Sequence, residues 1–119
     1  MTTITRENFT AAMEQAVAER GEDYVYPDEW RDEHGACQYA VASPQGPYTA
    51  ACLIGRAIEI VTGELVPGEF EGEGALSVLR DCYGAEDERL RAAAMEAQVV
   101  QDAGGTWGEA LARFKEYLA

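Results

Sequence analysis

The sequence predicts a mainly α-helical domain of the α+β class, with about five helices and a short two-stranded antiparallel ribbon in the N-terminal third. Two observations indicate this fold. In five segments apolar residues recur at the three- and four-residue spacing of a helix with one buried face. Residues 37–42 alternate between apolar and polar side chains, and residues 23–26 form a second short β-like run, each bounded by turn-forming residues.

The first helix is expected over residues 5–20. Thr5 suits the N-cap, Arg20 places a positive charge in the last turn, and Gly21 follows as a terminator. One face of this segment carries its apolar side chains: Phe9, Ala12, Met13, Ala16 and Val17. After it, residues 24–26 and 38–41 are expected to pair as the ribbon, which ends in a turn at residues 43–47. A two-stranded ribbon is marginal alone, so helices should pack against it.

Four further helices are expected, at residues 49–62, 75–83, 86–103 and 107–118. Thr49 is the predicted cap of the second helix, and Gly63 is its terminator. Thr106 and Glu109 form a capping-box pattern at the start of the last helix. The fourth helix has a broad apolar stripe, which is typical of a helix packed against two neighbours.

The length of 119 residues and the apolar content of 47% indicate one globular domain, residues 1–119. Its longest apolar runs, such as residues 50–54, fall far short of the ~20 residues that span a bilayer. The N-terminus lacks the basic start and apolar stretch of a secretory signal. We therefore expect a cytoplasmic protein whose three cysteines stay free of disulfides.

The formal net charge is −13, from 22 acidic and 9 basic residues. Like-charge repulsion argues against direct binding to nucleic acid or to an anionic membrane surface. A basic protein partner fits this charge, as does simple solubility. No cofactor is indicated, because the sequence has no phosphate-binding loop, dinucleotide fingerprint or EF-hand loop.

The cysteines and the single histidine are one candidate site. His34, Cys37, Cys52 and Cys82 carry the nitrogen and sulfur atoms that zinc prefers, but only His34 and Cys37 are closely spaced. Cys52, in the first turn of the predicted second helix, is also a candidate nucleophile with His34 as its base. Buried cysteines commonly pack as small apolar residues, so core packing is the favoured interpretation of both patterns.

A second candidate is polar. Gln98, Gln101 and Asp102 share one helical edge, either as a small polar site or as a hydrogen-bonding set that braces the corner at Gly104 and Gly105. Bracing is favoured, because such side chains commonly satisfy helix ends.

Aromatic residues rimmed by acidic ones are typical of an interface. This pattern predicts a partner-binding surface at Tyr24, Tyr26, Trp30, Asp32 and Glu33, with the acidic segment 64–73 as a second part. The same aromatic residues are equally suited to a satellite core that covers the ribbon.

Several short motifs resemble a family of small uncharacterised proteins encoded by actinobacteria and their phages. The motifs are Gly-Ala-Cys-Gln-Tyr at residues 35–39, Ala-Cys-Leu-Ile-Gly-Arg at 51–56, Ala-Gln-Val-Val-Gln-Asp-Ala-Gly at 97–104 and Trp-Gly-Glu-Ala-Leu at 107–111. Similar sequences often have Pro-Ser before the cysteine, where this chain has Ala50 and Ala51. The resemblance spans residues 24–111 and implies a source and a compact fold, but no activity.

These observations predict a non-enzymatic acidic accessory protein, of phage or actinobacterial origin, that binds another protein. In one variant it is a DNA mimic whose carboxylates occupy the basic groove of a nucleic-acid-binding protein. The alternative class is a small enzyme or a ligand- or metal-binding domain that uses Cys52 with His34, or Gln98, Gln101 and Asp102. Assembly into a homo-oligomer stays open.

Overall fold

A computed structural model describes residues 3–33, 35–42 and 48–119. The described residues form five α-helices: α1 (Arg6–Arg20), α2 (Leu53–Thr62), α3 (Ala75–Asp81), α4 (Glu88–Asp102) and α5 (Trp107–Leu118). They also form the antiparallel strands β1 (Ala40–Ala42) and β2 (Tyr48–Ala50), and the 3-10 turns η1 (Asp28–Trp30) and η2 (Gly68–Phe70). The predicted fold class is therefore confirmed.

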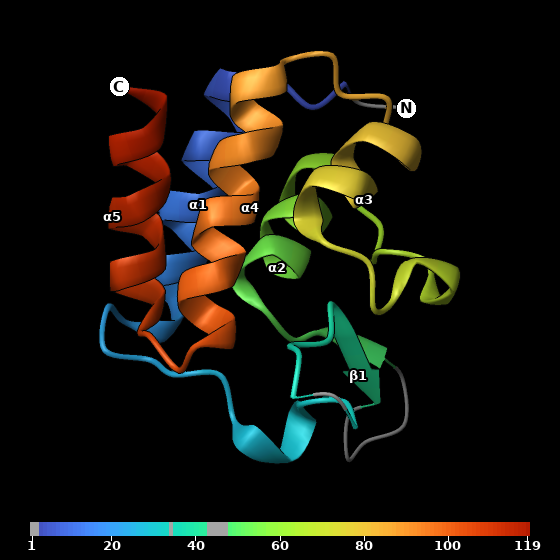
Figure 1. Cartoon of the computed structure of the whole chain (residues 1–119), viewed down its shortest axis with the longest axis vertical. Helices are drawn as coiled ribbons and strands as arrows, with labels where there is room; N and C mark the ends of the chain where they lie inside the picture. The colour runs from blue at the N-terminus through green and yellow to red at the C-terminus, as the bar shows by residue number, and fades with distance from the viewer. Residues whose placement is uncertain (1–2, 34, 43–47) are drawn as a thin grey trace.

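Helix α4 is the centre of the arrangement. It contacts α5 on one side, α3 on the other and α2 behind it, while α1 packs against α2 and α5 (Figure 1). The ribbon and η1 lie at one end of the molecule, and the start of α1 and the end of α5 lie at the opposite end (Figure 1). The predicted arrangement of α4 between neighbouring helices is thus the arrangement found.

The core fills the space between these helices. The predicted apolar face of α1 is buried along its whole length, and the Phe9 ring lies 5.9 Å from the Phe114 ring of α5. Large side chains from several elements are fully buried with them, including Trp107, Tyr26, Tyr39, Met13 and Leu90. Burial of such side chains stabilises the fold by roughly 1.5–3 kcal/mol each.

Local caps fix the starts of α1 and α5. The Thr5 hydroxyl accepts a hydrogen bond from the Asn8 backbone N–H (3.1 Å), and the Asn8 side chain accepts one from the Thr5 N–H (2.8 Å). Thr106 and Glu109 form the same reciprocal pair, at 3.0 and 2.9 Å. Each pair satisfies two N–H groups at the helix start. The two predicted caps are confirmed.

The predicted pairing of the ribbon is wrong. Residues 24–26 do not pair with residues 38–41; β1 pairs with β2, with Val41 opposite Thr49. The physical reason is that the segment after α1 serves the N-terminus of α5, where the Tyr24 carbonyl accepts a hydrogen bond from the Trp107 N–H at 2.8 Å. The predicted turn at 43–47 lies outside the described residues.

The predicted start of the second helix is also wrong. Thr49 belongs to β2, and α2 begins at Leu53 with Cys52 as its N-cap residue. The Cys52 sulfur accepts a hydrogen bond from the Gly55 N–H at 3.3 Å. The helix ends as predicted at Gly63, whose φ of 80° favours glycine.

Gly55 brings α2 against the backbone before β1. A methyl group there would overlap the Tyr39 carbonyl oxygen. We expect Gly55→Ala to lower the free energy of unfolding by about 1–3 kcal/mol, because backbone displacement outweighs the gain in helix propensity. Urea denaturation measures this change. Gly68→Ala is the control, since a methyl group there meets nothing within 4 Å; equal stabilities of the two variants would contradict the close approach.

Candidate functional site

The predicted polar set on α4 separates into two buried amides and one carboxylate. Gln98 is 4% exposed and Gln101 is fully buried. The Gln98 Oε1 accepts a hydrogen bond from the Ala75 N–H at 2.6 Å, and its Nε2 donates to the Tyr39 hydroxyl at 2.9 Å. The Gln101 Oε1 accepts a hydrogen bond from the Leu53 N–H at 2.9 Å.

The bonds to Ala75 and Leu53 have the same purpose. These are the first residues of α3 and α2, and the first N–H groups of a helix have no acceptor within it. One face of α4 therefore supplies acceptors to two other helices. The arrangement supports the bracing interpretation over a polar ligand site, although the amides brace α2 and α3 rather than the corner at Gly104 and Gly105.

Cys52 lies beside Gln101 in the buried interior. Burial raises the pKa of the Cys52 thiol to about 12, and the Gly55 N–H and the Gln101 amide oppose this only in part. A fully buried thiol with a raised pKa lacks both properties that a nucleophile needs, access and a thiolate. His34, its predicted base, lies outside the described residues. Within the described ranges no group of three His, Cys, Asp or Glu side chains is arranged to hold a metal.

Arg31, which the sequence analysis did not single out, fastens the segment after η1 to α4. Its guanidinium donates to the carbonyl oxygens of Gln101 (3.2 Å), Asp102 (3.1 Å) and Gly35 (3.0 Å). A cation is favourable at the C-terminal carbonyls of a helix. The Asp102 Oδ1 adds a second tie by accepting a hydrogen bond from the Cys37 N–H at 3.1 Å. We call residues 28–33 and 35–37 the Arg31 strap.

The predicted aromatic anchors lie at different depths. Tyr26 is 1% exposed, and its hydroxyl donates to the Trp30 carbonyl at 2.7 Å, so its ring belongs to the core. Tyr24 is half-buried with its ring edge-on to Trp107 and under the Arg20 guanidinium. Trp30 is half-buried against the Tyr26 ring. The satellite-core interpretation therefore describes Tyr24 and Tyr26, and Trp30 retains surface that a partner could contact.

The loop 64–74 is held to β1 by Glu71. Its two carboxylate oxygens accept hydrogen bonds from the Tyr39 N–H (2.9 Å) and the Ala40 N–H (3.1 Å). The Tyr39 hydroxyl donates to the Glu73 carbonyl at 2.6 Å. Burial raises the pKa of Glu71, and the negative charge of Asp32 adds to the rise.

A small cleft of about 220 Å³ separates the strap from this loop. Its lining comes from the strap, the loop and α4: Ala36, Cys37, Gly72, Glu73, Gly74, Met95, Gln98 and Asp102. Asp102 is thus the one residue of the predicted polar set that joins α4, the strap and the cleft, while Gln101 faces the interior.

The charges of the chain are segregated. Arg31 is the only Lys or Arg between positions 21 and 50, and neither residue type occurs from 57 to 79, yet half of the 22 acidic residues lie in these two stretches. The other eight Lys and Arg residues all lie on the five α-helices. Most of them form ion pairs there, such as Arg56 with Glu19 (2.8 Å) and Lys115 with Glu14 (2.6 Å).

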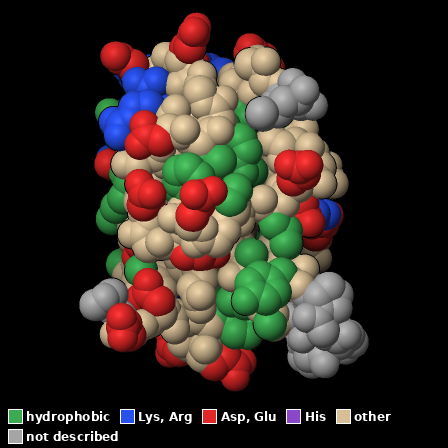
Figure 2. Space-filling view, turned by 90° about the vertical axis from the view of Figure 1, so that its right-hand side faces the viewer, with side chains coloured by type: hydrophobic (Ala, Val, Ile, Leu, Met, Phe, Trp, Pro, Cys, Tyr) green, Lys and Arg blue, Asp and Glu red, His purple; other side chains and the backbone are tan. Residues whose placement is uncertain are grey.

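Acidic side chains consequently dominate the strap side of the molecule. We call the carboxylates of the strap and of residues 69–73 the acidic end; they are Asp28, Glu29, Asp32, Glu33, Glu69, Glu71 and Glu73. Glu29, Glu69 and Glu73 form no ion pair with any described residue. The lower part of Figure 2 corresponds to this end, and it shows acidic side chains with apolar surface among them and no basic side chain.

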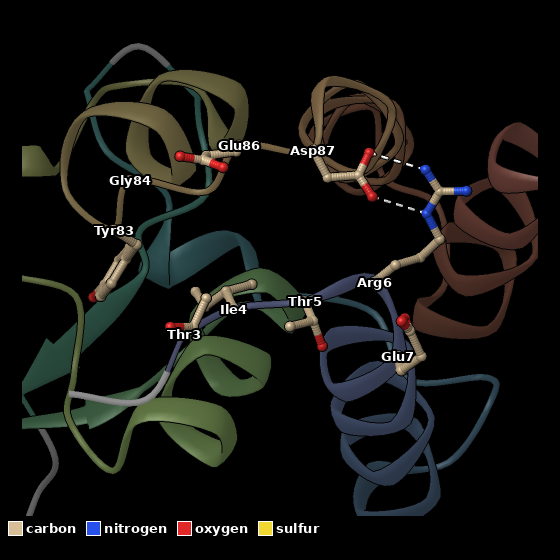
Figure 3. Close-up of a pocket in the computed structure, with 9 residues that line it drawn as sticks. All are labelled: Thr3, Ile4, Thr5, Arg6, Glu7, Tyr83, Gly84, Glu86 and Asp87. Carbon is tan, nitrogen blue, oxygen red and sulfur yellow. Dashed lines mark hydrogen bonds and ion pairs between the residues drawn. The ribbon is translucent and has the colours of Figure 1, made fainter.

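A larger hollow, of about 740 Å³, lies at the opposite end between the start of α1 and the α3–α4 connection (Figure 3). Two of its charged groups form an ion pair, because Arg6 donates to both oxygens of Asp87 at 2.9 Å. The guanidinium lowers the pKa of Asp87 to about 2. Asp87 also caps α4 by accepting a hydrogen bond from the Leu90 N–H. These groups join α1 to α4, and we assign them no ligand.

Comparisons with protein-family models, with curated proteins and with solved structures find no match for this chain. Among the described helices, none combines the length and apolar character needed to cross a membrane.

The buried amide of Gln101 gives a direct stability prediction. Gln101→Met keeps the volume but leaves the Leu53 N–H without its acceptor, so the free energy of unfolding should fall by about 1–3 kcal/mol. Chemical denaturation measures the change. Gln15→Met on the exposed side of α1 is the control and should change it by less than ~0.5 kcal/mol. Equal effects at both positions would show that the Gln101 bond contributes nothing.

Proposed function

We propose that this protein is a non-enzymatic accessory protein, of phage or actinobacterial origin, that binds a basic surface of another protein through its acidic end. The observation that carries the proposal is the segregation of charge. Most carboxylates on the helices form ion pairs with Lys or Arg side chains, while the strap and the loop 64–74 contain a single arginine and no lysine. Fields of one sign steer and select partners of the opposite sign.

The position of that one arginine supports the proposal. The Arg31 side chain is only 12% exposed, and its guanidinium is directed to the carbonyl oxygens of α4. Its hydrogen bond to a carboxylate of the acidic end is with Asp28, whose side chain is 96% exposed. The surface of this end therefore keeps its negative field.

Apolar surface is also available next to these charges. Trp30 and Phe70 are half-buried, one in the strap and one in η2. Tyr48, at the start of β2, is 66% exposed. Interfaces gain most of their affinity from a few aromatic anchors, and surrounding charges contribute mainly to the rate and specificity of association. Trp30 with the acidic end provides both kinds of group.

A charge-matched pair of variants tests the proposal. E29Q/E69Q/E73Q removes three carboxylates without ion pairs from the acidic end. E7Q/E86Q/E88Q removes three exposed carboxylates from the opposite end, so both variants have the same net charge. We expect the first variant to lose at least tenfold in affinity for a partner captured from an actinobacterial lysate, and the second to change little. Titration of the purified partner by calorimetry measures both.

Equal losses in the two variants would contradict binding through the acidic end, because only the net charge would then matter. Capture of no partner by the wild-type protein at low salt would contradict the binding function itself. The identity of the partner decides the DNA-mimic variant. That variant requires a nucleic-acid-binding protein and a complex that weakens steeply with salt.

A further inference from the structure

We infer that the Arg31 strap opens as one unit while the helices stay folded, and that the Arg31 guanidinium controls how often it opens. This inference goes beyond the proposed function, because it concerns the free protein and holds whether or not a partner binds. Opening would uncover both walls of the cleft of about 220 Å³, the one formed by Cys37 of the strap and the one formed by α4.

The strap is closed on itself by its own backbone bonds. The Asp32 N–H donates to the Ala36 carbonyl at 2.9 Å, and the Gly35 N–H donates to the Asp32 carbonyl at 3.0 Å. Arg31 and Cys37 form an isolated antiparallel bridge that closes this loop. A segment whose bonds are internal keeps its shape when it moves away from its support.

The hydrogen bonds from Arg31 and Cys37 to α4 are concentrated at one place. The Arg31 guanidinium reaches the carbonyls of Gln101 and Asp102, and the Cys37 N–H reaches the Asp102 carboxylate. At the base of the strap, the Tyr26 hydroxyl and the Gln38 side chain donate to the Trp30 carbonyl. The two bonds from Arg31 and the one from Cys37 therefore all end on Gln101 and Asp102, the last two residues of α4.

Apolar burial holds the strap at Trp30 and Cys37, which pack against the core, and adds little between them. Among its described residues Cys37 is the only buried one, at 5% exposure, and Trp30 is half-buried. Segments with few buried apolar contacts open at lower free energy than the core around them. Between these two residues the Arg31 fork holds the strap to α4: among the described residues it makes two of the three hydrogen bonds from Arg31 and Cys37 to α4, and it donates to the Gly35 carbonyl within the strap.

Opening changes access to specific groups. Ala36 and Cys37 form one wall of the 220 Å³ cleft, and Gln98 and Asp102 form part of the wall on α4. Movement of the strap widens this cleft and exposes the Cys37 thiol. The strap is thus a lid over the polar edge of α4, and it carries Asp32 and Glu33 of the acidic end with it, while Trp30 stays at its base.

Hydrogen exchange of the purified protein, followed by NMR, tests the inference without any partner. Arg31→Lys keeps the positive charge and loses the planar fork that donates to several acceptors at once. We expect the Cys37 N–H to exchange at least tenfold faster in this variant. The Asp32 N–H, which is bonded inside the strap, and the Ala110 N–H of α5 should change by less than threefold. Arg56→Lys, on the helical side of the molecule, is the control and should leave Cys37 exchange unchanged.

Each other outcome would overturn part of the inference. Unchanged Cys37 exchange would show that Arg31 does not hold the strap. Equal acceleration of Asp32 would show that the strap unravels instead of moving as a unit, and equal acceleration of Ala110 would show global unfolding. The rate of Cys37 alkylation by iodoacetamide should rise together with the exchange rate of its N–H, because opening exposes the thiol. The Arg31→Lys substitution preserves the positive charge near the thiol, so the faster alkylation would report access.

A second measurement needs no variant. In the wild-type protein, exchange of the Cys37 N–H should be nearly independent of low concentrations of urea, since strap opening exposes little surface. Exchange of the Ala110 N–H should rise steeply with urea. The same urea dependence for both amides would show that Cys37 exchanges only through global unfolding, and the inference would be wrong.

Discussion

Two amide oxygens on one face of α4 fix where two other helices begin. Gln98 and Gln101 are three residues apart, so they lie about one turn from each other and point into the same interior. Each accepts the first N–H of a helix, α3 in one case and α2 in the other. Buried donors without acceptors are costly, so α2 and α3 are stabilised in the one arrangement that satisfies both.

The rest of the molecule follows from this arrangement. Fixing α2 against α4 places β2 and β1 at one end, and Glu71 then closes the loop 64–74 onto β1. The C-terminus of α4 lies at the same end, where its last carbonyls take up the Arg31 guanidinium. The basic residues needed to pair the remaining carboxylates are on the helices instead. The acidic end is thus a consequence of where the charges fall along the fold.

Sequence reasoning succeeded where the deciding contacts are local. The helices and the caps at Thr5 and Thr106 depend on residues three or four positions apart, and pattern alone identifies them. It failed where the contacts are long-range. Leu53 and Gln101 are 48 residues apart, and nothing in the pattern shows that they meet. The wrong prediction of the ribbon pairing has the same cause. Residues 24–26, which were expected to pair with residues 38–41, contact the N-terminus of α5 instead.

The candidate site divides in the same way. The acidic character of residues 28–33 is visible in composition, and Trp30 retains the surface that the prediction requires. The sequence is equally consistent with a surface position and with burial of Tyr26 in a satellite core, and only the packing decides between them. Arg31 and Glu71 were missed, although Arg31 does carry a signal: it is the only Lys or Arg between positions 21 and 50. A single arginine among several carboxylates is expected to bind groups of its own segment, because acidic side chains lie close to it on both sides in the sequence.

The exchange rates of the Leu53 and Ala75 amide protons test the central claim most directly. First-turn N–H groups of a helix ordinarily exchange fast, as the exposed Glu7 N–H at the start of α1 should. If the two glutamines fix α2 and α3, both amides will exchange only through global unfolding, with the same free energy as the core amides of α4. Exchange of Leu53 and Ala75 as fast as that of Glu7 would show that the helices are held by packing alone and would contradict the account.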